Sequence, residues 1–536
     1  MRRIPFAIFL LVLVVYRSLI GSNDQIRFVD VTAQAGLLAP LEGMMGHAAA
    51  WGDVDADGDL DLYVGGFADR PDVEYVPARG PVPNRLFRNL GNGRFEAIAH
   101  PSGELYARTT SAVFADLDND GKLDLLVANN RRTLTKLLPG VQRNAQLQGS
   151  LLFRNQQGTL IDVTAMAGDC LTLARSARSV GVLDTDADGL LDLLMLEDRF
   201  GGTPHSRLCR NMGGFKFTDV TAWAGLPADL HGLGLAIADL NEDGRPDIFV
   251  THSNRLFMST REGKYIEPAG PKARLAWKPL NAEDWPAGAV FADLNRDGRL
   301  DLVIGVHHDH ARNRVFFNDG LEHGVPNFRD VSAEVGLPAY LNTKSPHVEV
   351  QDFDNDGWPD LYFSGAWLNA DGSVTPLVFR NDGLQGGLPR FEPLRPISTD
   401  QPRFYFPAGP SGDYDGDGRI DLFLANWFRD NHARLLRNLS RPNGWLEVKV
   451  AGKAMNRMGI GAKVRVYKAG ELGRPGGLLG LQEIGTGYGF ASAQVPVAHF
   501  GLGSEASVDV AIAFPDGSGT VIRDVGTDRR LTVEGP

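Results

Sequence analysis

Short apolar runs separated by polar turns repeat along most of this chain. In each repeat an apolar run such as HAAAWG (47–52) precedes an acidic loop, and a second run such as LDLYVGG (60–66) follows it. A third run reads NRLFRN at 84–89, and after a glycine-rich turn a fourth run often reads F-x-DVT. Runs of this length, rich in β-branched and aromatic residues and bounded by turn residues, predict β-strands. Each repeat therefore contains four predicted strands.

The acidic loop between the first and second runs has the consensus D-x-[DN]-x-D-G-x-x-D and occurs seven times. Its copies are Asp53–Asp61, Asp116–Asp124, Asp184–Asp192, Asp239–Asp247, Asp293–Asp301, Asp352–Asp360 and Asp413–Asp421. Their starts are separated by 63, 68, 55, 54, 59 and 61 residues. A period near 60 residues with four strands in each of seven units predicts a seven-bladed β-propeller.

The two ends of the repeat region predict how the ring closes. The run FVDVT at 28–32 is a fourth strand with no blade before it, and the seventh repeat ends after its third run, RLLRN at 434–438. We therefore expect the N-terminal strand to complete the seventh blade. This arrangement removes an open sheet edge, which would otherwise need protection.

The acidic loop has the ligand chemistry of a calcium site. Ca²⁺ takes about six to eight oxygen ligands in a flexible shell. Positions 1, 3, 5 and 9 offer side chains, position 7 offers a backbone carbonyl, and the glycine at position 6 permits the sharp turn. The predicted ligands are Asp53, Asp55, Asp57, Asp59, Asp61, Asp116, Asp118, Asp120, Lys122, Asp124, Asp184, Asp186, Asp188, Leu190, Asp192, Asp239, Asn241, Asp243, Arg245, Asp247, Asp293, Asn295, Asp297, Arg299, Asp301, Asp352, Asp354, Asp356, Trp358, Asp360, Asp413, Asp415, Asp417, Arg419 and Asp421.

An acidic turn that binds nothing is the alternative for any single copy of this loop. Seven copies with the same carboxylate pattern favour the metal site, because closely spaced unpaired carboxylates repel one another. Two copies carry an amide at position 3, Asn241 and Asn295. With three carboxylates instead of four, these two loops are expected to bind calcium more weakly.

The net charge of the chain agrees with this interpretation. Its 66 acidic and 54 basic residues give a formal charge of −12, and seven bound Ca²⁺ ions would bring it to about +2. The acidity therefore belongs mainly to the metal loops. No basic run or RNA-binding motif occurs in the sequence, so nucleic-acid binding is not expected.

The repeats resemble the FG-GAP (VCBS-type) calcium repeats of integrin α-subunit propellers. The segments DVTAQAGL (30–37) and DVTAWAGL (219–226) are similar to those of the cartilage acidic protein family. Near the C-terminus, NRMGIGAKVRV (456–466), GTGYG (485–489), HFGLG (499–503) and FPDG (514–517) resemble an ASPIC/UnbV domain. Phe514 stands where Trp is usual, and ASAQ (491–494) replaces a tighter Ser-Gln. The resemblance implies calcium binding and adhesion or matrix association.

Together these patterns predict an all-β chain of three parts. Residues 1–22 are a signal peptide or N-terminal anchor, residues 27–442 are the seven-bladed propeller, and residues 443–536 are a small β-sandwich-like ASPIC/UnbV domain. The 13-residue apolar stretch Ile4–Tyr16 suits a signal peptide better than a membrane span, although Arg17 and a missing A-x-A site weaken the cleavage prediction.

The compartment follows from the N-terminal segment and the cysteines. We expect a monomer that is secreted or held at the cell surface or in the periplasm, with no membrane contact beyond a possible N-terminal anchor. Cys170 and Cys209 are the only cysteines. In an oxidising compartment they could form a disulfide across the third repeat; the alternative is two buried thiols.

Ligand-binding residues are expected on the face of the ring opposite the acidic loops. First strands start there and second strands end there, with His47, Thr110, Arg178, His231, Trp285 and His347 on entry and Asn129, Asn130, Glu197, Asp198, His252, His307, Trp367, Asn426 and Trp427 on exit. Histidine, tryptophan and amide side chains around a propeller mouth can form a pocket. The alternative is an ordinary polar surface. A separate transition-metal candidate is HHDH at 307–310, although a solvated loop is the simpler explanation.

Two functions remain open from the sequence. The first is a calcium-stabilised interaction or adhesion module for an extracellular protein or glycan. The second is an enzyme in the propeller mouth, either glycan-processing or natural-product tailoring, with Glu197, Asp198, His252 and His307 as acid–base candidates. A third possibility is a mainly structural scaffold. The sequence has no known nucleophile or nucleotide-binding motif, so the interaction module is preferred over the enzyme.

Overall fold

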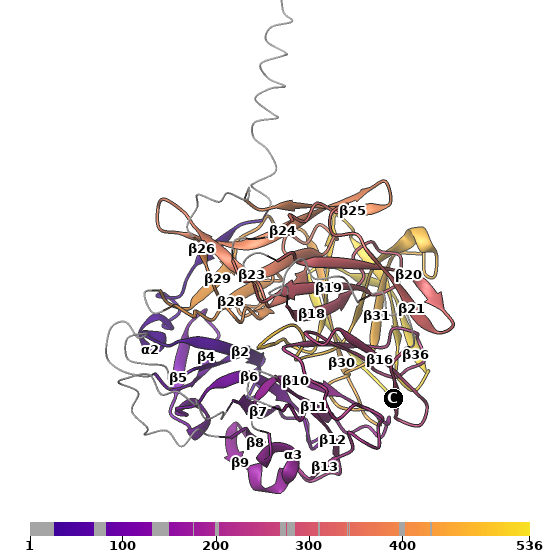
Figure 1. The fold of residues 1–536 in the computed structure, drawn as a ribbon. Coiled ribbons are helices and arrows are strands. Elements are labelled where there is room, and N and C mark those ends of the chain that lie inside the picture. The colour runs from indigo at the N-terminus through magenta and orange to yellow at the C-terminus, as the bar shows by residue number, and fades with distance from the viewer. Residues whose placement is uncertain are drawn as a thin grey trace, which may run out of the picture.

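The computed structural model describes residues 26–68, 82–130, 149–174, 176–198, 203–268, 275, 285–308, 311–339, 341, 343–395, 403–428 and 431–536. Within these residues the regular secondary structure is almost entirely β-strand (Figure 1). The short helical segments are α2 (Leu38–Leu41), η2 (Pro101–Gly103), η3 (Thr164–Ala167), α3 (Asp169–Thr172) and η6 (Pro475–Gly477). The expected signal segment lies outside the described residues.

Seven antiparallel sheets of four main strands follow one another along the chain. The first contains β2 (Gly46–Gly52), β3 (Asp61–Gly66), β4 (Arg85–Asn89) and β5 (Phe95–Ile98). The second contains β6 (Thr109–Ala115), β7 (Asp124–Asn129), β8 (Leu151–Gln156) and β9 (Thr159–Asp162). The third contains β10 (Ala177–Leu183), β11 (Asp192–Glu197), β12 (Arg207–Asn211) and β13 (Phe217–Asp219). The fourth contains β14 (Leu235–Ala238), β15 (Asp247–Val250), β16 (Arg255–Ser259) and β17 (Tyr265–Ile266).

The last three sheets continue the same order. The fifth contains β18 (Pro286–Ala292), β19 (Asp301–Val306), β20 (Arg314–Glu322) and β21 (Val325–Asp330). The sixth contains β22 (Val348–Gln351), β23 (Asp360–Leu368), β24 (Val374–Gln385) and β25 (Leu388–Pro393), with β26 (Arg403–Phe404) paired to β23. The seventh contains β27 (Ser411–Gly412), β28 (Asp421–Leu424), β29 (Arg434–Asn438) and β1 (Phe28–Asp30).

The N-terminal strand β1 completes the seventh sheet, as the sequence predicts. It pairs antiparallel with β29, with Phe28 opposite Asn438. The seventh sheet is also bonded to the first: the Trp51 indole N–H donates to the Pro410 carbonyl at 3.1 Å, and the Gly46 N–H donates to the Asn426 carbonyl at 2.6 Å. These contacts confirm the predicted all-β fold with seven propeller blades.

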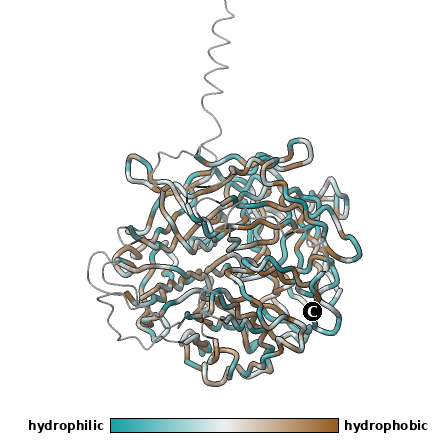
Figure 2. The backbone as a smooth tube through the Cα atoms, viewed as in Figure 1, coloured by the Kyte–Doolittle hydropathy of each residue, from teal (hydrophilic) through white to brown (hydrophobic). Residues whose placement is uncertain are grey.

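The core lies between neighbouring blades. Every residue of β2, β3, β6 and β7 is buried, because each blade packs one face against the blade before it and the other against the blade after it. Gly52 shows how close this packing is, since a Cβ there would lie 2.6 Å from the Phe114 ring of the second blade. In Figure 2 the hydrophobic stretches lie mainly along the strands, and hydrophilic residues gather in the peripheral loops.

The C-terminal region forms two further sheets. One has the order β34 (Ala498–Gly503), β30 (Gly444–Ala451), β37 (Arg529–Glu534), and the other has the order β32 (Leu478–Glu483), β31 (Lys463–Lys468), β35 (Ser507–Ala513), β36 (Gly519–Gly526). Val448 of the first sheet and Val464 and Val510 of the second share one buried cluster. This is the expected small sandwich-like domain; its predicted bounds, 443–536, stay a prediction.

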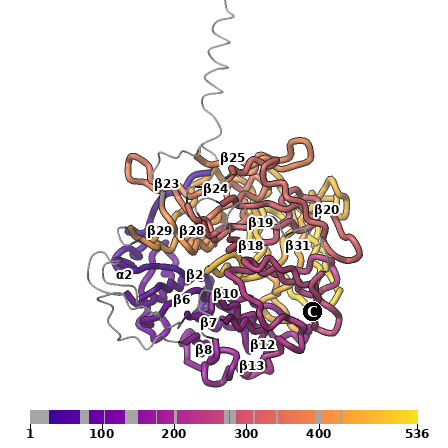
Figure 3. Tube along the Cα trace, viewed as in Figure 1, coloured from indigo at the N-terminus to yellow at the C-terminus, as the bar shows by residue number. Residues whose placement is uncertain are grey.

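One C-terminal segment enters the centre of the propeller. Strand β33 (Ser492–Ala493) pairs in parallel with β2, the first strand of blade 1. The Gly489 N–H donates to Ala289 of blade 5 at 2.9 Å, and the Phe490 N–H donates to Nδ1 of His347 beside blade 6 at 3.1 Å. The segment 485–494 therefore contacts the inner strands of blades on opposite sides of the ring. Figures 1 and 3 show the C-terminal strands, in yellow, lying against the blades.

Candidate metal loops and ligand face

All seven acidic loops have the same backbone frame. In the first loop, the two carboxylate oxygens of Asp53 accept the N–H groups of Asp57 at 3.1 Å and Gly58 at 3.0 Å. Gly58 has a φ of +97°, which a residue with a side chain adopts only at a cost. The Asp59 N–H donates to Asp57 at 3.0 Å. The same bonds recur in the other six loops.

The aspartate at position 9 joins each loop to the third strand of its blade. Oδ2 of Asp61 accepts the N–H of Val54 at 2.9 Å, and Oδ1 accepts the N–H of Asn89, the last residue of β4, at 2.8 Å. The Asn89 side chain then donates to the carbonyl of Tyr414 in the seventh loop at 2.9 Å. Equivalent asparagines link four other neighbouring pairs of blades through Asn155, Asn211, Asn381 and Asn438. The loops therefore fasten neighbouring blades together.

Five of the seven loops bring three carboxylates within 4.8 Å of one another. The groups are Asp53, Asp55 and Asp57; Asp116, Asp118 and Asp124; Asp184, Asp186 and Asp188; Asp352, Asp354 and Asp356; and Asp413, Asp415 and Asp421. The two loops with asparagine at position 3 do not form such a group among the described residues. Their amides instead donate to position 5, Asn241 to Asp243 at 3.2 Å and Asn295 to Asp297 at 3.0 Å.

An arginine from the third strand contacts the position-3 aspartate in each of these five loops. Arg154 lies 2.8 Å from Asp118, and Arg380 lies 2.8 Å from Asp354. The remaining pairs are Arg88 with Asp55, Arg210 with Asp186 and Arg437 with Asp415. These arginines are the fifth residue of the repeated NRLFRN pattern. From the sequence, this pattern predicted only the third strand of each blade.

The carboxylates fit a cation such as Ca²⁺. Four position-3 aspartates, Asp55, Asp186, Asp354 and Asp415, keep one buried oxygen with no hydrogen-bond partner. A buried carboxylate oxygen without a partner is costly. Burial also raises the pKa of the position-9 carboxyls, to about 7 for Asp61 and for Asp124. Oxygen ligands with uncompensated negative charge are the donor set that a hard divalent cation prefers.

Part of the expected ligand face forms an aromatic cluster at the propeller mouth. His47 stacks on Phe67 with ring centroids 4.8 Å apart and meets Trp427 at 5.6 Å. Phe490, from the C-terminal segment in the channel, lies 5.3 Å from His47 and 6.1 Å from His307. Burial lowers the pKa of His307 to about 3. The histidines and Trp427 could be predicted from the sequence, but Phe490 could not, because nothing in the local sequence places that residue inside the ring.

Several other face candidates are buried and bonded to neighbouring protein groups. Asn129 is fully buried and donates to the Gly149 carbonyl at 2.8 Å. Glu197 accepts the N–H of His205 at 3.0 Å, and Asp198 is ion-paired with Arg178. Trp367 is only 2% exposed. The Asn426 amide donates to two nearby backbone carbonyls. Asn130 is also buried, and the Thr110 hydroxyl donates to backbone carbonyls of blades 2 and 3.

The four acid–base candidates have different neighbours. His252 lies 5.3 Å from His231 and 6.0 Å from Trp285, whereas His307 lies beside Tyr405 and Phe490. Of the histidine-rich segment 307–310, the last two residues lie outside the described residues. A different histidine, His347, is fully buried with Glu349, 2.6 Å away.

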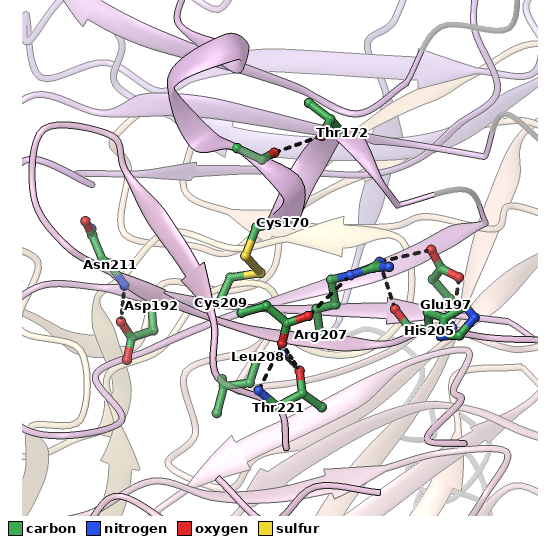
Figure 4. Close-up of a disulfide and its surroundings, with 12 residues drawn as sticks. Cys170, Thr172, Asp192, Glu197, His205, Arg207, Leu208, Cys209, Asn211 and Thr221 are labelled. Atoms are coloured by element: carbon green, nitrogen blue, oxygen red, sulfur yellow. Dashed lines mark hydrogen bonds and ion pairs between the residues drawn. A yellow bond between two sulfur atoms is a disulfide. The ribbon is translucent and has the colours of Figure 1, made fainter. Parts of the chain in front are cut away.

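The two cysteines form a disulfide. It joins α3 to β12 within the third blade, with a Cα–Cα distance of 5.9 Å (Figure 4). Of the two alternatives that the sequence left open, the structure contains the bonded pair. Among the residues that the structure describes, no helix is long and apolar enough to cross a membrane.

Comparison with known families matches both parts of the chain. The FG-GAP-like repeat family matches residues 69–127, 184–250 and 293–363, and the ASPIC and UnbV family matches residues 452–536. Cartilage acidic protein 1 of Homo sapiens is 26% identical over 514 residues, which cover 91% of this chain and 71% of that protein. The Mus musculus protein is also 26% identical, covering 91% and 73%, and the Xenopus tropicalis protein is 25% identical, covering 88% and 71%.

Solved structures give a more distant likeness. A lectin of Agrocybe aegerita, described as recognising non-reducing terminal N-acetylglucosamine, has a TM-score of 0.39 at 18% identity, covering 68% of this chain and 82% of that one. A BBS1N chain from a complex with ARL6 has a TM-score of 0.40 at 12% identity, covering 77% and 97%.

Proposed function

We propose that this FG-GAP repeat protein, which ends in an ASPIC/UnbV domain and is homologous to cartilage acidic protein 1, is a secreted, calcium-stabilised interaction module for an extracellular protein or glycan. The observation that carries the proposal is the set of partnerless buried oxygens in the acidic loops. They indicate that the scaffold is completed by a cation. A partner would then bind on the opposite face, where aromatic side chains gather.

Calcium would be held by the side chains at positions 1, 3, 5 and 9 and the carbonyl at position 7 of each loop. Bound there, it supplies positive charge that offsets the clustered carboxylates. The chain's own contribution is geometric: backbone N–H groups orient the carboxylates at positions 1 and 9, and the glycine at position 6 allows the turn. Because position 9 also fixes the third strand, occupancy of the loop would stabilise the blade.

Thermal unfolding with calcium and with a chelator tests the metal site. A ligand at 100 times its Kd stabilises the native state by about 2.7 kcal/mol per site, so chelation should lower the melting temperature markedly. The variant Asp354→Asn removes a position-3 carboxylate and should reduce the calcium-dependent shift, whereas Glu96→Gln changes an exposed strand residue and should leave it intact. A melting temperature that does not respond to chelation would contradict the calcium proposal.

The partner surface is best assigned to the half-buried and exposed aromatics at the mouth. Trp427 is half-buried, and Phe428 is 44% exposed, with the Tyr405 ring 6.2 Å from Phe428. Amphipathic aromatic rings at a concave mouth suit protein or sugar contacts. Trp427→Ala should abolish capture on glycan or matrix-protein arrays without changing the melting temperature by more than a few degrees.

Trp367→Ala is the control variant in this experiment. Because it is buried against Arg395, Trp367→Ala should lower stability, by about 3–5 kcal/mol, and affect binding only through folding. If Trp427→Ala and Phe428→Ala retain full binding of every array partner of the wild-type protein, the partner does not use this face. Secretion is supported by the Cys170–Cys209 disulfide, since disulfides persist in oxidising compartments.

A further inference from the structure

A cavity of about 590 Å³ lies between the acidic-loop side of the propeller and the C-terminal domain. Its propeller wall comes from the inner strands β14, β18, β22 and β27 and from five of the acidic loops. Its other wall comes from β30, β32, β34 and β37 and from the segment that enters the channel. Small-molecule sites have volumes of about 300–1,000 Å³ and favour the junctions between folded units. This cavity is on the side of the ring opposite the aromatic mouth.

Much of the cavity wall is apolar. Ile237, Phe291 and Val350 line it from the inner strands of three blades, and all three are half-buried although they lie beneath the C-terminal domain. Leu481 and Phe500 line it from the C-terminal sheets. Apolar side chains left partly exposed inside a molecule favour a ligand with an apolar body, because that ligand removes the remaining surface from water.

Charged side chains on the C-terminal wall are arranged in register. Glu447 on β30 stands opposite His499 on β34 and Arg530 on β37. The Arg530 guanidinium lies 3.2 Å from Glu447 and 3.1 Å from Asp413 of the seventh loop. Arg530 therefore already contacts two carboxylates, which leaves it little capacity for a ligand.

Three more cations line the cavity, and two of them have other contacts: Arg296 lies over the Trp358 ring, and Arg457 donates to Asn119. Lys449 is the third. It lies two residues after Glu447 on β30, so both side chains project from the same side of the sheet and line the cavity. Lys449 is exposed, and among the described residues it forms no ion pair within 4.0 Å. The loop aspartates that line the cavity are oriented by their own backbone N–H groups. Calcium bound in those loops would offset most of their negative charge, so an anion beside Lys449 would face few uncompensated carboxylates.

We propose that this cavity binds a small molecule with an apolar body and one anionic group, with Lys449 as the partner of the anion. The assignment of the anion rests on the proposed function, because the loop carboxylates are counted together with their calcium ions. The apolar part does not depend on it.

Binding of 8-anilinonaphthalene-1-sulfonate to the full-length protein tests the proposal, because this fluorescent probe has an aromatic body and one anion. We expect saturable binding of one equivalent in calcium buffer. Lys449→Met should raise the Kd about tenfold, the factor for losing one charge-assisted contact. Lys468→Met, which removes an exposed lysine of the same domain, should leave the Kd unchanged. The uncharged analogue N-phenyl-1-naphthylamine should bind both variants equally.

A cavity-filling variant identifies where the probe binds. Val497 is half-buried and lines the cavity, so Val497→Trp should abolish binding of both probes while the melting temperature shows that the protein is folded. Binding that does not saturate, that survives Val497→Trp, or that responds equally to Lys449→Met and Lys468→Met would overturn the proposal. Repeating the titration with chelator separates the calcium proposal from the cavity proposal. If calcium does not bind, chelation leaves the melting temperature unchanged. Binding of the uncharged probe still tests the cavity in that case.

Discussion

At the scale of single residues, the third-strand arginines change the charge of the metal loops. Loops with aspartate at position 3 carry an arginine contact, as in Asp118 with Arg154. The two loops with asparagine have Met258 and Phe317 at the corresponding strand position. Counted over positions 1, 3, 5 and 9 and this strand residue alone, each loop therefore carries −3 before a cation binds. The charge at these positions therefore does not distinguish the two asparagine loops, and weaker calcium binding at Asn241 and Asn295, which rests on their smaller number of carboxylates, stays a prediction.

The variant Arg154→Met tests this compensation. Removing the cation should tighten calcium binding at the second loop and destabilise the metal-free protein by less than about 1 kcal/mol, because Arg154 is partly exposed. The double variant Asp118→Asn/Arg154→Met reproduces the composition of the fourth and fifth loops and should return both quantities toward wild type. Calorimetric titration and chelator melting curves measure them. Weaker calcium binding in Arg154→Met would show that the arginine helps to hold the metal instead of competing with it.

At the scale of elements, the C-terminal segment in the channel depends on close approach of its backbone. Gly489 has a φ of +75°, and a Cβ there would lie 2.7 Å from Nδ1 of His347. Gly489→Ala should therefore lower the free energy of unfolding by at least about 1–3 kcal/mol through strain and loss of the Phe490 hydrogen bond. Gly476→Ala is the matched control, because a Cβ there meets nothing within 4 Å. Equal denaturation midpoints for the two variants would contradict the close packing of this segment in the channel.

The elements also show what the sequence could and could not predict. The repeats, the blade number and the closing strand β1 were predictable because each has a local pattern of strands and turns that recurs along the chain. The pairing of β33 with β2 was not, since it spans more than 400 residues and uses two residues of each strand. From the sequence, residues 485–489 could be assigned only to the C-terminal domain. The sequence did contain the arginine contacts, because arginine and position-3 aspartate occur together in five loops.

At the scale of the whole molecule, the C-terminal domain covers the acidic-loop side of the ring and interlocks with it. Lys463 of β31 is buried and donates to the Asp239 carbonyl at 2.6 Å, and it is 3.1 Å from the Asp239 carboxylate. The Asp239 N–H in turn donates to Glu483, and burial raises the pKa of Glu483 to about 8. His499 reaches Asn355 of the sixth loop at 3.0 Å. The metal loops therefore bind the C-terminal domain and also link neighbouring blades.

This interlocking predicts that the propeller and the C-terminal domain unfold together. Lys463→Met removes the buried cation that contacts Asp239 and neighbours Glu483, and it should destabilise the protein by about 3–5 kcal/mol. The variant has weaker contacts between the acidic loops and the C-terminal domain. Scanning calorimetry should therefore show one unfolding transition in the wild-type protein and separate transitions for the propeller and the C-terminal domain in the variant. Lys453→Met removes a solvent-exposed pair with Glu534 in the same domain and should unfold as the wild type does. Two independent transitions in the wild-type protein would mean that the contacts at Lys463 and in the channel do not couple the two parts.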